Sequence, residues 1–128
     1  MKIEITHKDD NHLVVETRGQ TLPVHRGVSA DDATDGFMAS ELLLGGLGAC
    51  MLGTALTFAR NTDMPLDDLR VVMDADSAAN PERLQTIRVT MTATGQLTDR
   101  HLASLSRVAA RCKIHNTLAD PPTVELSL

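Results

Sequence analysis

Two cysteines are the residues of this 128-residue chain whose type and setting could support covalent chemistry. Cys50 ends the stretch ELLLGGLGAC, in which three of four consecutive residues are glycine, and Cys112 lies between Arg111 and Lys113. Glycine removes side-chain bulk and leaves room for another helix, strand or ligand, and nearby cations favour a thiolate. A thiolate and a thiol brought together by folding would form a peroxidase or disulfide-exchange centre. The alternative is purely structural, because a free cysteine usually behaves as a small buried hydrophobe.

A metal site is a weaker interpretation of the same residues. Cys112 and His115 have C-x-x-H spacing, and Cys50 could be a third ligand, but a lone pair is weak compared with a doubled C-x-x-C motif. The segment GGLG lies inside a predicted helix rather than after a strand, so it is no dinucleotide-binding fingerprint. We therefore expect no metal and no cofactor. The remaining histidines fall in strand, turn or helix-start contexts that suggest exposure: His7, His12, His25 and His101.

Glu41 is the acidic residue that precedes the glycines, nine positions before Cys50. A straight helix turns about 100° per residue, so the two side chains should lie on opposite helix faces. The simplest role for Glu41 is to lie beside the positive end of the helix dipole. Contact with the thiol would have to be indirect.

Composition excludes several classes of partner. The net charge is −5, and Phe37 and Phe58 are the only aromatic residues apart from histidine. Nucleic acid binding needs a basic face and commonly aromatic stacking platforms, so no nucleic acid partner is expected. The uncharged run 42–59 is near the lower length limit for a membrane span, but its glycines and threonines favour a buried helix. We expect no membrane association, no signal peptide and a cytoplasmic location.

Hydrophobic periodicity predicts the elements that must position the two cysteines. Alternating β-type runs and two helical patterns follow one another along the chain. The predicted strands are 2–7, 12–17, 21–25, 66–76, 82–95 and 123–128, and the predicted helices are 38–60 and 98–111. The order βββ-α-ββ-α-β implies an α+β fold with largely antiparallel sheets. No linker or repeat is visible, so residues 1–128 are expected to form a single domain.

Two segments together resemble the OsmC/Ohr family of thiol-dependent peroxidases: ASELLLGGLGAC, and RCKIHNTL some sixty residues later. The family has the same order of elements, with a long central helix that carries the first cysteine and a second helix followed by the second cysteine. The resemblance spans essentially the whole chain. It implies an intertwined homodimer in which the N-terminal strands of each subunit pair with the other. In such a dimer the glycines would allow the backbones of two central helices to approach closely where they cross.

The resemblance also implies a reaction. Carried over by position, Cys50 is the peroxidatic cysteine that attacks an organic hydroperoxide, and Cys112 is the resolving cysteine. A small or lipoyl-type dithiol would reduce the resulting disulfide.

Two positions depart from the pattern of the peroxidases. They carry a carboxylate ten residues before the first cysteine, where this chain has Ser40, and Glu41 is one step later. They also use an N-terminal arginine, for which Arg18 is the first candidate here and Arg26 the second. These departures favour an alternative: a catalytically weak dimer of the same fold that acts as a ligand-binding or stress-associated protein.

Overall fold

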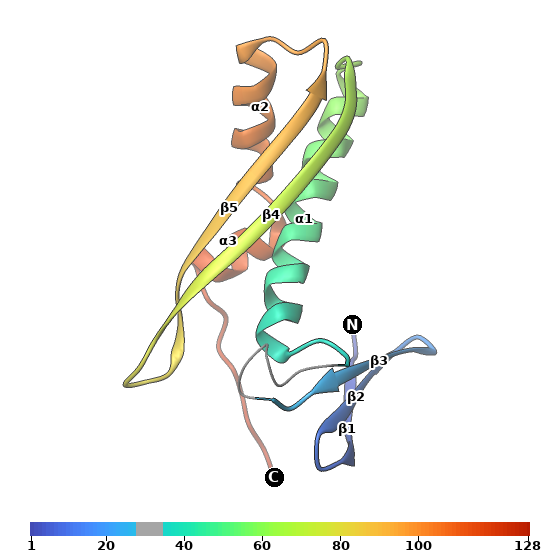
Figure 1. The fold of residues 1–128 in the computed structure, drawn as a ribbon, viewed down its shortest axis with the longest axis vertical. Helices are drawn as coiled ribbons and strands as arrows, with labels where there is room; N and C mark the ends of the chain where they lie inside the picture. The colour runs from blue at the N-terminus through green and yellow to red at the C-terminus, as the bar shows by residue number, and fades with distance from the viewer. Residues whose placement is uncertain (28–34) are drawn as a thin grey trace. The chain divides into compact units, whose positions relative to one another are not determined.

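The computed structural model describes residues 1–27 and 35–128 (Figure 1). The chain forms two compact units, Met1–Leu43 and Leu44–Leu128, each of which is described below by itself. Its elements, in order, are β1 (Glu4–Asp9), β2 (His12–Thr17), β3 (Gln20–His25), α1 (Ala39–Asn61), β4 (Leu66–Ala78), β5 (Arg83–Gly95), α2 (Asp99–Ala109) and α3 (Lys113–Ala119). The predicted α+β class with antiparallel sheets is confirmed. The single domain stays a prediction.

The first unit contains a three-stranded antiparallel sheet in the order β1-β2-β3. Arg18 and Gly19 both have positive φ, 51° and 75°, and they join β2 to β3 as a two-residue turn. Two positive φ values are the signature of the type I′ hairpin turn, whose twist matches that of the flanking strands. Pro23 lies in β3 at the edge of this sheet, a position that suits proline because it has no N–H for a second neighbouring strand.

Helix α1 begins in the first unit and continues into the second. Its buried residues lie three or four positions apart, the spacing of one helix face: Leu47, Gly48, Met51, Ala55 and Ala59. Gly48, near Cys50, is closely packed, since a Cβ there would lie 2.7 Å from Met73 Sδ. A Cβ at Gly45 or Gly46 would meet no atom of the described residues within 4 Å. Two of the three glycines are thus unexplained by packing within one chain.

Strands β4 and β5 form a long antiparallel hairpin across α1 and α2 (Figure 1). Every second side chain of β4 faces the helices, among them Leu69, Val71 and Met73, and Ile87, Val89, Met91 and Ala93 of β5 face the same way. Because side chains alternate across a strand, the intervening polar residues face solvent. Leu105 and Ala109 of α2 complete the core with α1 and β4. The predicted alternation is confirmed in both strands.

The segment after α2 differs from the prediction at two places. Residues 113–119 form the short helix α3, which the sequence analysis did not anticipate. The predicted strand 123–128 does not form: Val124 and Leu126 are 87% and 96% exposed. An alternating apolar pattern makes a strand only where a sheet edge offers hydrogen bonds, and no strand pairs with 123–128 in the described residues of a single chain.

Candidate active site at two cysteines

The two cysteines lie in the second unit, one within α1 and the other in the segment between α2 and α3. Cys50 is half-buried in α1, and Cys112 is the residue immediately before α3, with 2% of its surface exposed. Cys112 is the N-cap of that helix: its Sγ accepts a hydrogen bond from the His115 backbone N–H at 3.3 Å. Both thiols are free. The structure thus holds one accessible thiol and one buried thiol.

The surroundings of the two thiols shift their acidity in opposite directions. The pKa of Cys50 is lowered, first by a hydrogen bond from the Ile114 backbone N–H, and further by the Cys112 thiol, the Lys113 backbone N–H and the Lys113 charge. Burial raises the pKa of Cys112, and the neighbouring Cys50 raises it further. Hydrogen bonds to a thiolate favour the charged form, whereas desolvation opposes it. Cys50 is therefore the member of the pair suited to be the thiolate, with Cys112 as its thiol neighbour.

Sequence reasoning predicted the pair but missed the backbone amides that act on Cys50. They belong to the first residues of α3, where N–H groups have no partner within a helix. The signal that could have revealed this helix is Pro121 and Pro122, because proline commonly follows a helix end. The predicted cation beside Cys112, Lys113, acts mainly through its backbone and on Cys50.

Glu41 lies in the first turn of α1, the position that its predicted role beside the helix dipole requires. Its Oε2 accepts a hydrogen bond from the Met38 backbone N–H at 2.8 Å. Because α1 begins at Ala39, this contact satisfies one unpaired amide at the helix start, as the third helical residue does in a capping box. Glu41 belongs to the first unit and Cys50 to the second. Their predicted lack of direct contact stays a prediction.

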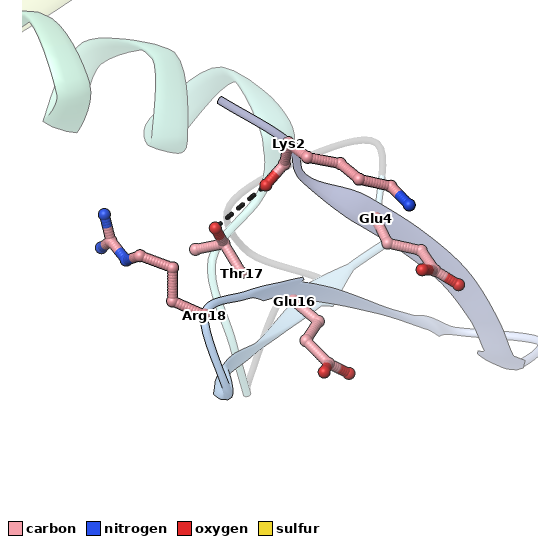
Figure 2. A pocket seen from close by; sticks show the side chains of 5 residues that line it. All are labelled: Lys2, Glu4, Glu16, Thr17 and Arg18. Atoms are coloured by element: carbon pink, nitrogen blue, oxygen red, sulfur yellow. Dashed lines mark hydrogen bonds between the residues drawn. The ribbon is translucent and has the colours of Figure 1, made fainter.

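The two candidate arginines also lie in the first unit. Arg18 lines a shallow hollow of about 330 Å³ together with Lys2, Glu4, Glu16 and Thr17. Figure 2 shows Arg18 extending away from the other lining side chains, and the Thr17 hydroxyl donates to the Lys2 carbonyl at 3.1 Å. Arg26 donates through Nη1 to the Asp10 carbonyl at 3.0 Å. A role for either arginine at Cys50 stays a prediction.

The metal set considered from the sequence is not assembled. In residues 1–27 and 35–128, Cys50, Cys112 and His115 do not form a group of three converging ligand atoms. Among the residues that the structure describes, His115 Nδ1 is buried without a hydrogen-bond partner.

A different cluster, which sequence reasoning missed, does converge. His12, His25 and Asp35 each offer a ligand atom, and these atoms lie within 4.8 Å of one another. The available signal is that His12 and His25 are equally far from the Arg18–Gly19 turn, so a two-residue hairpin places them opposite each other.

Comparison with protein families identifies a match over most of the chain. A family model described as OsmC-like protein matches residues 30–127, which include both cysteines and both long helices. No curated protein matches the chain. Helix α1 is long and apolar enough to cross a membrane by length and composition, with 22% of its most apolar window buried. The family match includes this helix and favours its assignment to the OsmC-like fold.

Solved structures are similar over nearly the full chain. The OsmC-like protein from Mycoplasma pneumoniae has a TM-score of 0.82 at 21% identity, covering 94% of this chain and 87% of its own. An organic hydroperoxide resistance protein from Legionella pneumophila has a TM-score of 0.65 at 17% identity, covering 92% and 89%. The organic hydroperoxide resistance protein OhrB of Bacillus subtilis has a TM-score of 0.61 at 16% identity, covering 94% and 93%. At these identities the likeness shows the fold.

Proposed function

The chain belongs to the family of OsmC-like proteins, and from this premise we propose that it is a thiol-dependent peroxidase that reduces organic hydroperoxides. Cys50 is the proposed peroxidatic residue and Cys112 the resolving residue. The proposal follows the resemblance of ASELLLGGLGAC and RCKIHNTL to the peroxidase members. Two related proteins of the same fold are named for resistance to organic hydroperoxides.

The observation that carries the proposal is the unequal pair of thiols. Attack on a peroxide requires a thiolate, and the Ile114 amide and its neighbours lower the pKa of Cys50. Resolution requires a second thiol next to the first, and the pKa shifts of Cys50 and Cys112 each have the other thiol among their causes. A buried thiol whose pKa is raised by desolvation is protected from direct oxidation until the first cysteine has reacted.

The proposed reaction balances in three steps. The Cys50 thiolate attacks the terminal peroxide oxygen, the O–O bond breaks, and the alkoxide leaves and takes up a proton as an alcohol. The sulfenic acid formed on Cys50 then reacts with the Cys112 thiol, which gives a Cys50–Cys112 disulfide and releases water. A dithiol, of small or lipoyl type, exchanges with this disulfide, so both protein thiols return and the dithiol becomes a cyclic disulfide.

We further propose that the protein works as a cytoplasmic homodimer. Leu56 of α1 is 43% exposed. On the same helix, a Cβ built at Gly45 or Gly46 would meet no atom of the described residues within 4 Å. An exposed apolar helix face marks an interaction surface, and glycines permit a second backbone to approach closely. These features support packing of the α1 helices of two subunits against each other.

Thiol counting tests the reaction directly. Fully reduced protein is mixed with cumene hydroperoxide, quenched, and its remaining free thiols are titrated. We expect both thiols to disappear together with one equivalent of peroxide, and peptide mapping to identify a Cys50–Cys112 disulfide. Dihydrolipoamide should then restore both thiols and support continuous turnover.

Two variants separate the roles of the cysteines. Cys50→Ser should consume peroxide no faster than a cysteine-free control. Cys112→Ser should consume one equivalent and stop, with a sulfenic acid on Cys50 that dimedone traps. Persistence of both thiols in the wild-type protein, or undiminished peroxide consumption by Cys50→Ser, would refute the proposal.

A second candidate function is a dimer that binds a ligand or acts in stress without efficient catalysis. Two observations favour it. The Glu41 carboxylate already accepts a hydrogen bond from the Met38 backbone N–H, and Ser40 occupies the position where the peroxidases have their carboxylate. Introducing the carboxylate with Ser40→Glu discriminates the two. If the native site is catalytically weak, this variant should react with cumene hydroperoxide faster than the wild type. An unchanged or slower rate would favour the peroxidase assignment for the native sequence.

A further inference from the structure

The register of the N-terminal sheet brings together residues that are far apart in the sequence. Asp9 of β1 is the partner of His12 in β2, and His12 is the partner of His25 in β3. Residues directly opposite each other in antiparallel strands have Cβ atoms about 4.5–5.5 Å apart. One acidic and two imidazole side chains therefore meet at the same end of this sheet.

Asp35 joins them because the backbone that follows it is fixed to β3. The His25 backbone N–H donates to the Phe37 carbonyl at 2.8 Å, and Phe37 forms a parallel bridge with Val24. Gly36 has φ of 75°, and a Cβ there would lie 2.8 Å from the Pro23 carbonyl oxygen. This close approach of two backbones is available only to glycine, and it places the Asp35 carboxylate against the two histidines.

His12 lies between the two carboxylates. Its Nδ1 is 2.7 Å from Asp9 Oδ1, and its Nε2 is 2.9 Å from Asp35 Oδ2. The His25 ring packs edge-on against the His12 ring, with centroids 5.4 Å apart and planes at 86°. The side chain of His12 is 21% exposed and that of Asp35 is 64% exposed, so an ion can reach the cluster from solvent.

We propose that His12, His25 and Asp35 form a binding site for a divalent transition metal, Zn²⁺ in the first place, and that Asp9 orients His12. Two imidazoles and one carboxylate are a ligand set suited to Zn²⁺, with the fourth tetrahedral position left for water. An Nδ1–H of a ligating histidine is commonly held by a carboxylate, which fixes the ring so that Nε2 faces the metal. The Asp9–His12 contact has this arrangement.

Loading the site requires two local changes. Zn²⁺ ligands at about 2.0–2.1 Å from the ion lie roughly 3.3 Å from one another in a tetrahedral site, whereas the ligand atoms here lie within a wider limit of 4.8 Å of one another. A small rotation of the His25 ring toward His12 would supply this contraction. Coordination through His25 Nε2 also places the ring proton on Nδ1, so the Gly27 N–H, which now donates to Nδ1 at 2.7 Å, must find another partner.

The test uses Co²⁺ and Zn²⁺ titration of the full-length Cys50→Ser/Cys112→Ser protein, in which no thiol can bind metal. Solutions are kept mildly alkaline, because metal binding requires deprotonated ligands and is favoured as pH rises. We expect one Co²⁺ per chain, the visible absorption of a tetrahedral ion, and its displacement by Zn²⁺. Proton NMR should show the ring resonances of His12 and His25 shifting on Zn²⁺ addition.

Matched variants establish which residues bind. His12→Ala, His25→Ala and Asp35→Asn should each weaken Zn²⁺ binding by more than about tenfold, and Asp9→Asn should weaken it by about 10–100-fold. His7→Ala is the control, because His7 lies exposed in β1 of the same sheet outside the cluster; it should bind as the parent does.

Two outcomes overturn the proposal. One is the absence of stoichiometric metal binding, which would make the cluster a set of carboxylate–imidazolium ion pairs only. The other is an equal loss of binding in His7→Ala and His12→Ala. If a ligand variant does not fold, the stoichiometry and NMR shifts of the parent still decide the question.

Discussion

Cys50 and Cys112 have identical side chains and opposite surroundings. Amide N–H groups at the start of α3 lower the pKa of Cys50, whereas burial raises the pKa of Cys112. A peptide N–H has a fixed position and carries no counter-charge to be screened by salt. The reactivity of Cys50 should therefore depend more on where α3 begins than on the charge of Lys113, which is a smaller cause of the lowered pKa.

Removing the Ile114 N–H should make Cys50 less acidic. Ile114→Pro deletes this donor at the second residue of α3, within the first turn, where proline is tolerated because the amide has no partner within the helix. We expect the pKa of Cys50 to rise relative to Ile114→Ala, which loses the same side-chain packing and keeps the N–H. The measurement is the rate of iodoacetamide alkylation against pH, in a Cys112→Ser background for both variants.

The lowered pKa of Cys50 sets the direction in which its alkylation rate changes with pH. A lowered pKa keeps Cys50 as a thiolate to lower pH, so its alkylation in the Ile114→Ala protein should persist below the range of an ordinary cysteine and be lost as pH falls through the lowered value. The Ile114→Pro profile should lie at higher pH. Coinciding profiles, with unchanged helix content by circular dichroism, would mean that the Ile114 amide has no effect on the thiolate.

Two glycines with the same positive φ allow backbone strain to be separated from steric conflict. Gly19 and Gly36 both have φ of 75°, but a Cβ meets nothing within 4 Å at Gly19 and lies 2.8 Å from the Pro23 carbonyl oxygen at Gly36. Gly19→Ala should lower the free energy of unfolding by about 1–2 kcal/mol from left-handed strain alone. Gly36→Ala should lower it further. Urea unfolding measures both, and equal losses would contradict the close approach of these backbone segments.

At the scale of elements, local patterns predicted what local interactions determine. Alternation identified β2 and the β4–β5 hairpin, and the uninterrupted apolar run identified α1. The strand predicted at 123–128 has an equally regular pattern and does not form, because a strand also needs an edge to pair with. Helix α3 was missed because its cap is Cys112, a residue not among the usual capping types.

The start of α2 offers a test of helix capping by Thr98. Thr98 Oγ1 accepts from the His101 backbone N–H at 3.2 Å, and His101 Nδ1 accepts from the Thr98 backbone N–H at 3.2 Å. Thr98→Ala should reduce the free energy of unfolding by about 1 kcal/mol, whereas Thr98→Ser keeps the hydroxyl and should lose little. Thermal and urea unfolding compare the two. An equal loss in both would attribute the effect to the threonine methyl group instead of the cap.

At the scale of the whole molecule, the sequence predicted the cysteine pair through its resemblance to a family and missed the histidine cluster. The pair could be predicted because Cys50 and Cys112 are the only cysteines in the sequence and each lies in a segment that resembles the family. The cluster depends on strand register and on how the backbone after Asp35 packs against β3, which are non-local facts. Contacts with a partner chain are also non-local and cannot be predicted from local patterns. The apolar residues Leu56, Val124 and Leu126 stay exposed in the isolated chain.

A charge on the exposed face of α1 should therefore dissociate the proposed homodimer. Leu56→Glu would bury an unpaired carboxylate where two α1 helices pack, and burying an isolated charge is strongly unfavourable. Leu102→Glu on α2 is the matched control, because Leu102 is also 43% exposed. Sedimentation velocity at several protein concentrations should show a dimer for the wild type and Leu102→Glu, and a monomer for Leu56→Glu. A dimeric Leu56→Glu protein would place the subunit contact away from this face of α1, and the open space at Gly45 and Gly46 would then need another explanation.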